Sequence, residues 1–104
     1  MCDYFKVNAD LLRSTELSVI AKLVLNSFVA FYYTKGAVEI SYDHFAYSYG
    51  VSVEEIETAV EELIKKGYVL SSEVNGKKDR MGYIKYSVVL ATDKIKNKFR
   101  NTML

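Results

Sequence analysis

The sequence predicts a single α+β domain, residues 1–104, in which helices come first and a β-hairpin follows. Three observations support this prediction. Between residues 17 and 67, apolar residues recur at spacings of three and four, the period of a helix with one buried face. From residue 68 the period changes to two, as in a strand. The five glycines stand near the changes of pattern, and the chain contains no proline.

The composition excludes several classes of protein. The chain has 14 Lys and Arg against 13 Asp and Glu, and half of its residues are apolar, as in an ordinary globular domain. No apolar run reaches the roughly 18 residues that a membrane span needs, and no basic segment leads into an apolar stretch at the amino terminus. We therefore expect a cytoplasmic protein without membrane contact. Cys2 and His44 are single residues of their kind, so we expect no disulfide, no zinc site and no cofactor.

The first long helix is predicted over residues 17–33, after an N-terminal arm of residues 1–16. Ser14 or Thr15 is the expected N-cap. The apolar stripe consists of Leu17, Ile20, Ala21, Val24, Phe28 and Phe31. Residues 34–36 are expected to turn, and residues 37–40 to form a short extended segment.

A second, short helix is expected from its cap Ser41 to about residue 47, and Gly50 ends it. Ser52 and Glu55 then have the spacing of a capping box, so a third helix begins there. Small Ala46 and flexible Gly50 suit two helices that cross closely at a tight turn. This combination is typical of a helix-turn-helix.

The third helix is expected to end near residue 67. Lys65 and Lys66 match the negative end of the helix dipole, and Gly67 supplies a left-handed cap. Its buried stripe is expected to consist of Val53, Ile56, Val60, Leu63 and Ile64.

Residues 68–91 are predicted to form a hairpin with a polar tip at residues 75–82. The inward-facing residues are expected to be Tyr68, Leu70, Val74, Ile84, Tyr86, Val88 and Leu90. Thr92 or Asp93 is expected to cap a last basic helix, residues 92–104, with Ile95 and Phe99 on one side. The order of elements is that of a winged helix: a three-helix helix-turn-helix core in residues 17–67, a β-hairpin wing and a C-terminal helix.

The chain also resembles a known family. The matching stretches, in chain order, are Phe5-Lys6-Val7, Leu11-Leu12, Leu17-Ser18, Ala21-Lys22, Ile40-Ser41-Tyr42, Gly50-Val51-Ser52, and Leu63 with Lys66-Gly67-Tyr68. They resemble winged-helix DNA-binding domains, and most closely the amino-terminal domain of phage and plasmid replication initiators and replisome organisers of Gram-positive systems. The resemblance covers about residues 5–90. It implies binding of double-stranded DNA in phage- or plasmid-related DNA replication or transcription regulation.

In a helix-turn-helix, the first turns of the second helix enter the major groove. The candidate DNA-binding residues of this helix and its approach are therefore Ser41, Tyr42, Ser52, Glu54, Glu55 and Thr58. Glu54 can accept a hydrogen bond from a cytosine amino group, or the glutamates simply suit the helix dipole. The alternative function is a winged-helix interaction module that binds a replication or transcription protein through its acidic third helix.

Positive charge is concentrated late in the chain. Residues 1–73 contain 6 basic and 11 acidic residues, whereas residues 74–104 contain 8 basic and 2 acidic residues. The predicted phosphate contacts on the wing are Lys77, Lys78 and Arg80. The last helix offers Lys94, Lys96, Lys98 and Arg100 as contacts to DNA or within a homodimer formed by the first and last helices. The alternatives are a solvated turn and a packing helix.

Nothing in the sequence predicts an enzyme. There is no glycine-rich phosphate loop, no nucleophile with an evident base, and no carboxylate pair outside the face of the third helix. Tyrosines are expected both in the core and at the surface. We expect Tyr49, Tyr68 and Tyr86 in the core. We expect Tyr32, Tyr33, Tyr42 and Tyr83 at the surface.

Overall fold

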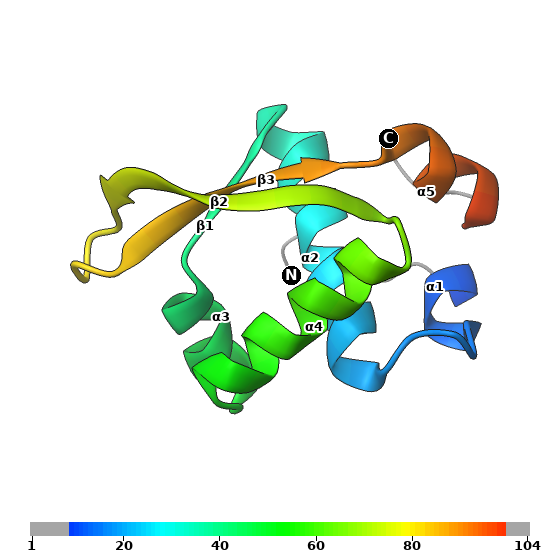
Figure 1. Ribbon diagram of the computed structural model, residues 1–104, viewed down its shortest axis with the longest axis horizontal. Coiled ribbons are helices and arrows are strands. Elements are labelled where there is room, and N and C mark those ends of the chain that lie inside the picture. The colour runs from blue at the N-terminus through cyan, green and yellow to red at the C-terminus, as the bar shows by residue number, and fades with distance from the viewer. Residues whose placement is uncertain (1–8, 100–104) are drawn as a thin grey trace.

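The computed structural model describes residues 9–99, which form an α+β fold (Figure 1). In this range five α-helices accompany one three-stranded antiparallel sheet. The elements in chain order are α1 (Ala9–Arg13), α2 (Val19–Lys35), β1 (Val38–Ile40), α3 (Tyr42–Tyr49), α4 (Val53–Lys65), β2 (Val69–Lys78), β3 (Ile84–Leu90) and α5 (Thr92–Lys98).

The first long helix, α2, begins later than predicted. Its N-cap is Ser18, whose side chain accepts a hydrogen bond from the Ala21 amide, so the prediction of Ser14 or Thr15 is wrong. The amide of Ser18 donates to the Glu62 carboxylate of α4 at 2.7 Å. This bond between distant residues ties the start of α2 to α4.

Helix α1 was not predicted, because residues 1–16 were expected to be an arm. With only 5 residues, α1 is too short for apolar periodicity to reveal it. Leu11 anchors it in the core, with 2% of its surface exposed.

The turn between α3 and α4 confirms the predicted local chemistry. Ser41 caps α3, and Gly50 ends it in the left-handed region with φ of 69°. The capping box at the start of α4 is present, with Glu55 amide to Ser52 hydroxyl at 3.1 Å and Ser52 amide to Glu55 carboxylate at 3.3 Å.

The end of α4 also follows the prediction. Gly67 has φ of 84° and donates its amide to the Ile64 carbonyl, while the Tyr68 amide donates to the Leu63 carbonyl. These two bonds form a Schellman motif. The buried stripe of α4 differs at two positions, since Ala59 is buried and Ile64 is not. Ile64 is 41% exposed, because the buried face follows Ile56, Ala59, Val60 and Leu63.

The sheet has the order β1-β3-β2, so the last strand lies in the middle. Val88 of β3 pairs with Val38 of β1 and with Ser72 of β2. Helices α2, α3 and α4 contact β1, β3 and β2, respectively. The core therefore lies between this sheet and the three helices, where the ring centroids of Phe28 and Phe45 are 5.9 Å apart.

The hairpin corrects the predicted inward-facing residues and tip. The pairing is irregular between Val69 and Ser71, so Val69 takes the buried place expected for Leu70, which is 62% exposed. Val74 and Ile84 are 58% and 46% exposed. Strand β2 continues through residue 78, so the turn at the tip comprises residues 79–83 rather than 75–82.

Helix α5 starts at residue 92, but neither Thr92 nor Asp93 caps it. Its N-cap is Ala91, which has no side-chain cap bond. Packing holds this helix instead: Ile95 is 0% exposed and Phe99 2% exposed, as predicted for both.

Candidate nucleic-acid interface

The start of α4 presents four of the predicted contact residues at the surface. The side chains of Ser52 and Glu55 cap each other's backbone amides. Glu54 and Thr58 are exposed and form no side-chain hydrogen bond or ion pair within residues 9–99. Glu54 and Thr58 are thus the side chains of this helix start that remain available to a ligand.

The two predicted approach residues lie in the interior. Ser41 is 4% exposed, and its hydroxyl accepts the His44 amide. Tyr42 is 6% exposed, stacks on Tyr86 with ring centroids 4.0 Å apart, and shares a hydrogen bond with Ser72. Burial raises the pKa of the Tyr42 hydroxyl. The expectation that Tyr42 is exposed is therefore wrong, because the residue fills the junction of α3 with the sheet.

The other tyrosine expectations agree with the structure. Tyr32, Tyr33 and Tyr83 are exposed, whereas Tyr68 is buried and Tyr49 packs partly buried against the core. The hydroxyl of Tyr49 shares a hydrogen bond with Ser27.

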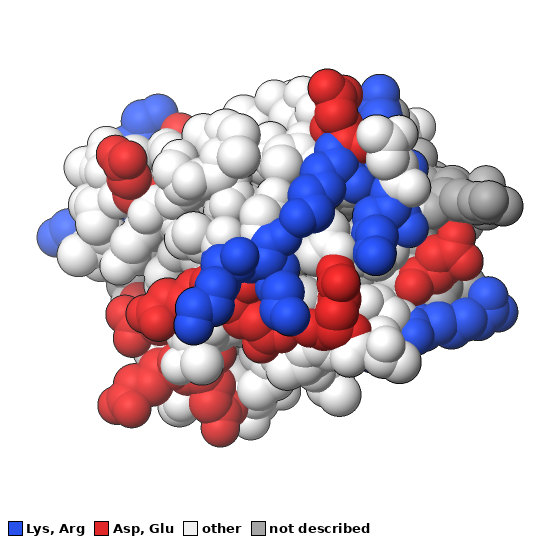
Figure 2. Space-filling view, turned by 45° about the vertical axis from the view of Figure 1, so that its right-hand side comes forward, with Lys and Arg blue, Asp and Glu red and all other residues white. Residues whose placement is uncertain are grey.

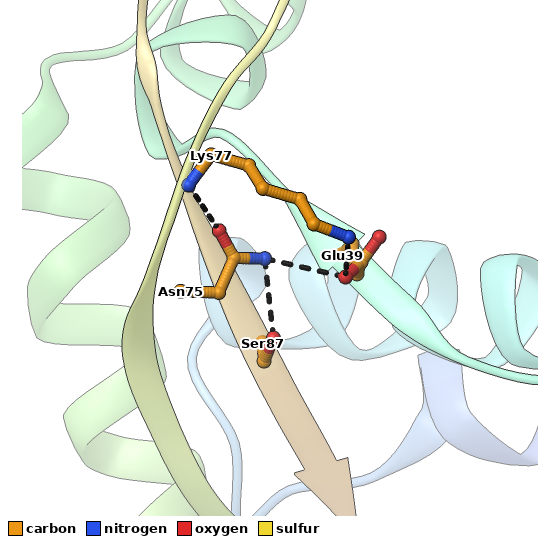
Figure 3. A network of polar contacts seen from close by, with 4 residues as sticks. All are labelled: Glu39, Asn75, Lys77 and Ser87. Atoms are coloured by element: carbon orange, nitrogen blue, oxygen red, sulfur yellow. Dashed lines mark hydrogen bonds and ion pairs between the residues drawn. The ribbon is translucent and has the colours of Figure 1, made fainter.

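A polar network fixes the middle of the hairpin (Figure 3). The Asn75 amide group donates to the Glu39 carboxylate at 3.3 Å and to the Ser87 hydroxyl at 3.2 Å, while its oxygen accepts the Lys77 amide. The ammonium of Lys77 lies 3.5 Å from the Glu39 carboxylate. Lys77 is therefore partly neutralised by β1.

The tip of the hairpin is closed by Asp79. One of its carboxylate oxygens accepts the amides of Met81 and Tyr83, both at 2.9 Å. Lys78 and Arg80 flank this residue. Both are exposed, and neither forms an ion pair within the described part of the chain. Of the three predicted wing cations, these two are the ones free to meet phosphates.

The structure adds residues to the hairpin surface that the sequence analysis missed. Met81 is 73% exposed, and Val74 and Ile84 are also exposed. The outer half of the hairpin is therefore both basic and apolar. In the sequence, the one signal for this mixed basic and apolar surface is that Met81 directly follows Arg80.

The lysines of α5 lie far from the hairpin tip. In Figure 1, which has the longest axis horizontal, the tip lies at the left end and α5 at the right, and the molecule is 36 Å long in that direction. Lys94 donates to the Lys66 carbonyl, and Lys98 lies 3.9 Å from the Glu16 carboxylate. Lys96 is exposed, and Arg100 lies outside the described residues. The predicted basic residues thus form two separate regions.

Glu16, in the segment before α2, interacts with Tyr68 before β2 and with Lys98 of α5. Its carboxylate accepts a hydrogen bond from the hydroxyl of Tyr68. This bond lowers the pKa of Glu16 and, together with burial, raises the pKa of Tyr68. The nearby ammonium groups of Lys98, Lys66 and Lys94 lower the pKa of Glu16 further.

Comparison of the chain with protein-family models, with curated proteins and with solved structures finds no match. The fold alone therefore defines the class, an α+β domain with a projecting basic hairpin. No helix within residues 9–99 is long and apolar enough to cross a membrane. In the same range, no three His, Cys, Asp or Glu side chains are grouped so that they could hold a metal ion.

Proposed function

We propose that this chain is a winged-helix protein that binds double-stranded DNA, with the start of α4 in the major groove and the β2–β3 hairpin as the wing on the backbone. One observation carries the proposal: Lys78 and Arg80 are unpaired cations at the end of a projecting hairpin. In Figure 1 the hairpin tip lies at the left, in the same half of the molecule as the α3–α4 turn at the bottom. Unpaired cations on a projecting ribbon are suited to phosphate contacts.

The α3–α4 pair supports this proposal. The two helices are joined by a tight turn at Gly50, and the first turn of α4 is exposed to solvent. Thr58 and Glu54 are the side chains suited to base edges, Glu54 as an acceptor for a cytosine amino group. The side chains of Ser52 and Glu55 are instead hydrogen-bonded to backbone amides in the capping box of α4.

The acidic residues of α4 weaken binding to DNA. Glu54, Glu57 and Glu61 are exposed and unpaired within residues 9–99. Two unit charges 8 Å apart in water interact by roughly 0.5 kcal/mol, so three glutamates cost about 1 to 2 kcal/mol per subunit. We infer weak non-specific binding that a homodimer strengthens. From the resemblance noted above, we propose a role in cytoplasmic phage- or plasmid-related DNA replication or transcription regulation.

The test is the salt dependence of binding to a labelled duplex, measured by fluorescence anisotropy. The variant Lys78→Ala/Arg80→Ala loses two phosphate contacts, so the slope of log affinity against log salt becomes shallower by about 1.8. Over the decade between 0.1 M and 1 M salt, this corresponds to a loss of affinity of up to roughly 60-fold at 0.1 M.

A matched control removes the same charge elsewhere. Lys35→Glu changes the net charge by the same two units at one exposed residue, at the end of α2 and outside the predicted contacts. This control should retain the wild-type slope. If Lys78→Ala/Arg80→Ala retains it as well, the hairpin does not bind phosphates and the proposal is wrong.

The second candidate function is binding of a replication or transcription protein through α4. The observation that favours it is a shallow groove of about 380 Å³ beside the acidic face, between the starts of α2 and α4. Its lining includes Ser18, Ile20, Thr58 and Glu62. A basic segment of a partner fits this surface.

One variant separates the two functions. Glu54→Gln/Glu57→Gln/Glu61→Gln removes repulsion, so affinity for a duplex should rise if α4 faces DNA. Affinity for a Lys/Arg-rich peptide, measured by calorimetry, should instead fall if α4 binds a protein. Unchanged duplex affinity would argue against α4 as the DNA-facing helix.

A further inference from the structure

A second basic surface lies at the end of the molecule opposite the hairpin tip. We call it the α4–α5 corner and define it by Lys65 and Lys66 at the end of α4 and by Lys94 and Lys98 of α5. All four residues are exposed. Figure 2 shows Lys and Arg side chains gathered in the middle of this face, with Asp and Glu side chains beside them and at the lower left.

The corner is built by specific contacts between α4, β2 and α5. The ammonium of Lys94 donates to the Lys66 carbonyl and lies 4.7 Å from the centroid of the Tyr68 ring. Gly67 makes room for it, because a Cβ at this position would lie 2.8 Å from the Lys94 nitrogen. Phe99 packs on Tyr68 with ring centroids 5.3 Å apart. The lysines of the two helices are therefore held together by the fold.

One carboxylate, that of Glu16, partly neutralises the corner. Glu16 lies 3.9 Å from Lys98 and also accepts the Tyr68 hydroxyl. Lys65 and Lys66 have no ion pair within residues 9–99. Cations at a helix C-terminus complement the helix dipole, and this explains the two lysines of α4 taken alone. It does not explain why a second helix brings Lys94 and Lys98 to the same place.

We propose that the α4–α5 corner binds the phosphate backbone of a second DNA duplex, so that one protein molecule bridges two duplexes. The proposal rests on the proposed function for the first duplex, which the start of α4 and the hairpin would hold. Four cations with one acidic partner, Glu16, complement a polyanion.

The direction of α4 separates the two duplexes. The helix has 13 residues, and at 1.5 Å per residue it is about 20 Å long. If its first turn enters a major groove, its last turn points out of that groove. Lys65 and Lys66 then lie about two Debye lengths from the groove at 0.1 M salt. Phosphates at the corner therefore belong to another duplex.

The experiment is a capture assay with the full chain. A duplex fixed on beads is incubated with protein and a fluorescent free duplex, and retained fluorescence measures bridging. Affinity for a single duplex is measured in parallel by anisotropy. The variants are Lys65→Ala/Lys66→Ala, Lys78→Ala/Arg80→Ala and their quadruple combination. The control Lys35→Glu has the same charge change and lies at the end of α2, outside both proposed surfaces.

We expect wild type and control to capture the free duplex. Lys65→Ala/Lys66→Ala should lose capture but keep the hairpin-dependent affinity for a single duplex. Lys78→Ala/Arg80→Ala should lose capture and bind a single duplex more weakly through the corner alone, and the quadruple variant should lose both activities. Circular dichroism melting checks that the variants are folded. The substituted residues are exposed, so melting temperatures close to wild type are expected.

Several outcomes would overturn the inference. Capture by Lys65→Ala/Lys66→Ala equal to the control means that bridging, if present, comes from a homodimer with two hairpins. Single-duplex binding without capture by the wild type means that the corner holds no DNA. Failure of the proposed function looks different: Lys78→Ala/Arg80→Ala then leaves single-duplex affinity unchanged, while Lys65→Ala/Lys66→Ala abolishes it.

Discussion

The bond between Tyr68 and Glu16 gives a sharp test of how the ends of the described chain are held together. Tyr68 is 1% exposed and precedes β2, and its hydroxyl donates to the carboxylate of Glu16, which lies in the segment before α2. Glu16 is exposed and also faces Lys98 at 3.9 Å. Replacing Glu16 and replacing Tyr68 should therefore lower the free energy of unfolding by different amounts.

The magnitudes follow from what each replacement leaves behind. Glu16→Ala leaves a buried hydroxyl without this acceptor, which costs about 1 to 3 kcal/mol. Tyr68→Phe removes the bond together with the polar group, so it should cost about 0.5 to 1.5 kcal/mol. Loss of the exposed pair with Lys98 adds at most about 1 kcal/mol to the first variant. Glu16→Ala should thus be the more destabilising change, by about 1 kcal/mol.

Urea unfolding followed by circular dichroism measures these differences at pH 7. The double variant Glu16→Ala/Tyr68→Phe should be less stable than Tyr68→Phe only by the lost ion pair with Lys98, at most about 1 kcal/mol, because no hydroxyl then remains to be satisfied. Glu16→Gln retains an acceptor and should cost less than Glu16→Ala. Lys98→Ala measures the ion pair by itself. If Tyr68→Phe proves as destabilising as Glu16→Ala or more so, the hydroxyl does not depend on Glu16 and the reasoning fails.

The pH dependence has a definite sign. The Tyr68 hydroxyl lowers the pKa of Glu16 in the folded state, and the lysines lower it further. The stabilisation is therefore present above the unfolded pKa and is lost as pH falls through the lower folded value. The stability difference between wild type and Glu16→Ala should shrink between about pH 5 and pH 3. A difference that stays constant over this range would contradict the assignment.

Three further substitutions test the fold. Leu63→Ala, at a residue that is 0% exposed, should cost about 2 to 5 kcal/mol in urea unfolding, and a loss below 1 kcal/mol would mean that α4 is poorly packed. Gly50→Ala, with φ of 69° and open space around it, should cost about 1 to 2 kcal/mol through backbone strain alone, and calorimetry should find Gly50→Asn less costly. Ser52→Ala removes the cap of α4 and should lower stability by about 1 kcal/mol, a melting shift of roughly 4 to 8 °C. A melting temperature equal to wild type would show that the capping box contributes nothing.

Most of the order of elements could be predicted from the sequence, and so could the burial of Tyr68, Val88 and Leu90. The prediction that Leu70, Val74 and Ile84 face inward is wrong. Alternation placed Leu70 inside, whereas an irregular register at the start of β2 buries Val69 instead. The shift is local, since Ser72 still pairs with Val88 and Val74 with Tyr86, but nothing in the local sequence marks it. Tyr42 was expected at the surface for a similar reason, since its stacking partner Tyr86 is 44 residues away.

The candidate site was predicted in part. Lys78 and Arg80 are exposed and unpaired, as a phosphate contact requires, but Lys77 is engaged by Glu39 of another strand. The sequence predicted Lys65 and Lys66 as cations that match the dipole at the end of α4. The bond from Lys94 of α5 to the Lys66 carbonyl makes them part of the α4–α5 corner. The basic residues after position 74, close together in sequence, are divided by the fold between opposite ends of the molecule.

The sequence by itself determined where α3 and α4 begin and end. The residues that set these ends act through hydrogen bonds or dihedral angles within three or four residues: Ser41, Ser52, Gly50 and Gly67. Their effect can therefore be predicted from the local sequence alone. Tertiary structure decided which side chains of the hairpin are buried and which lysines meet across helices. Those outcomes depend on contacts between residues far apart in the chain, such as the bond from Lys94 to Lys66, and therefore only the folded molecule determines them.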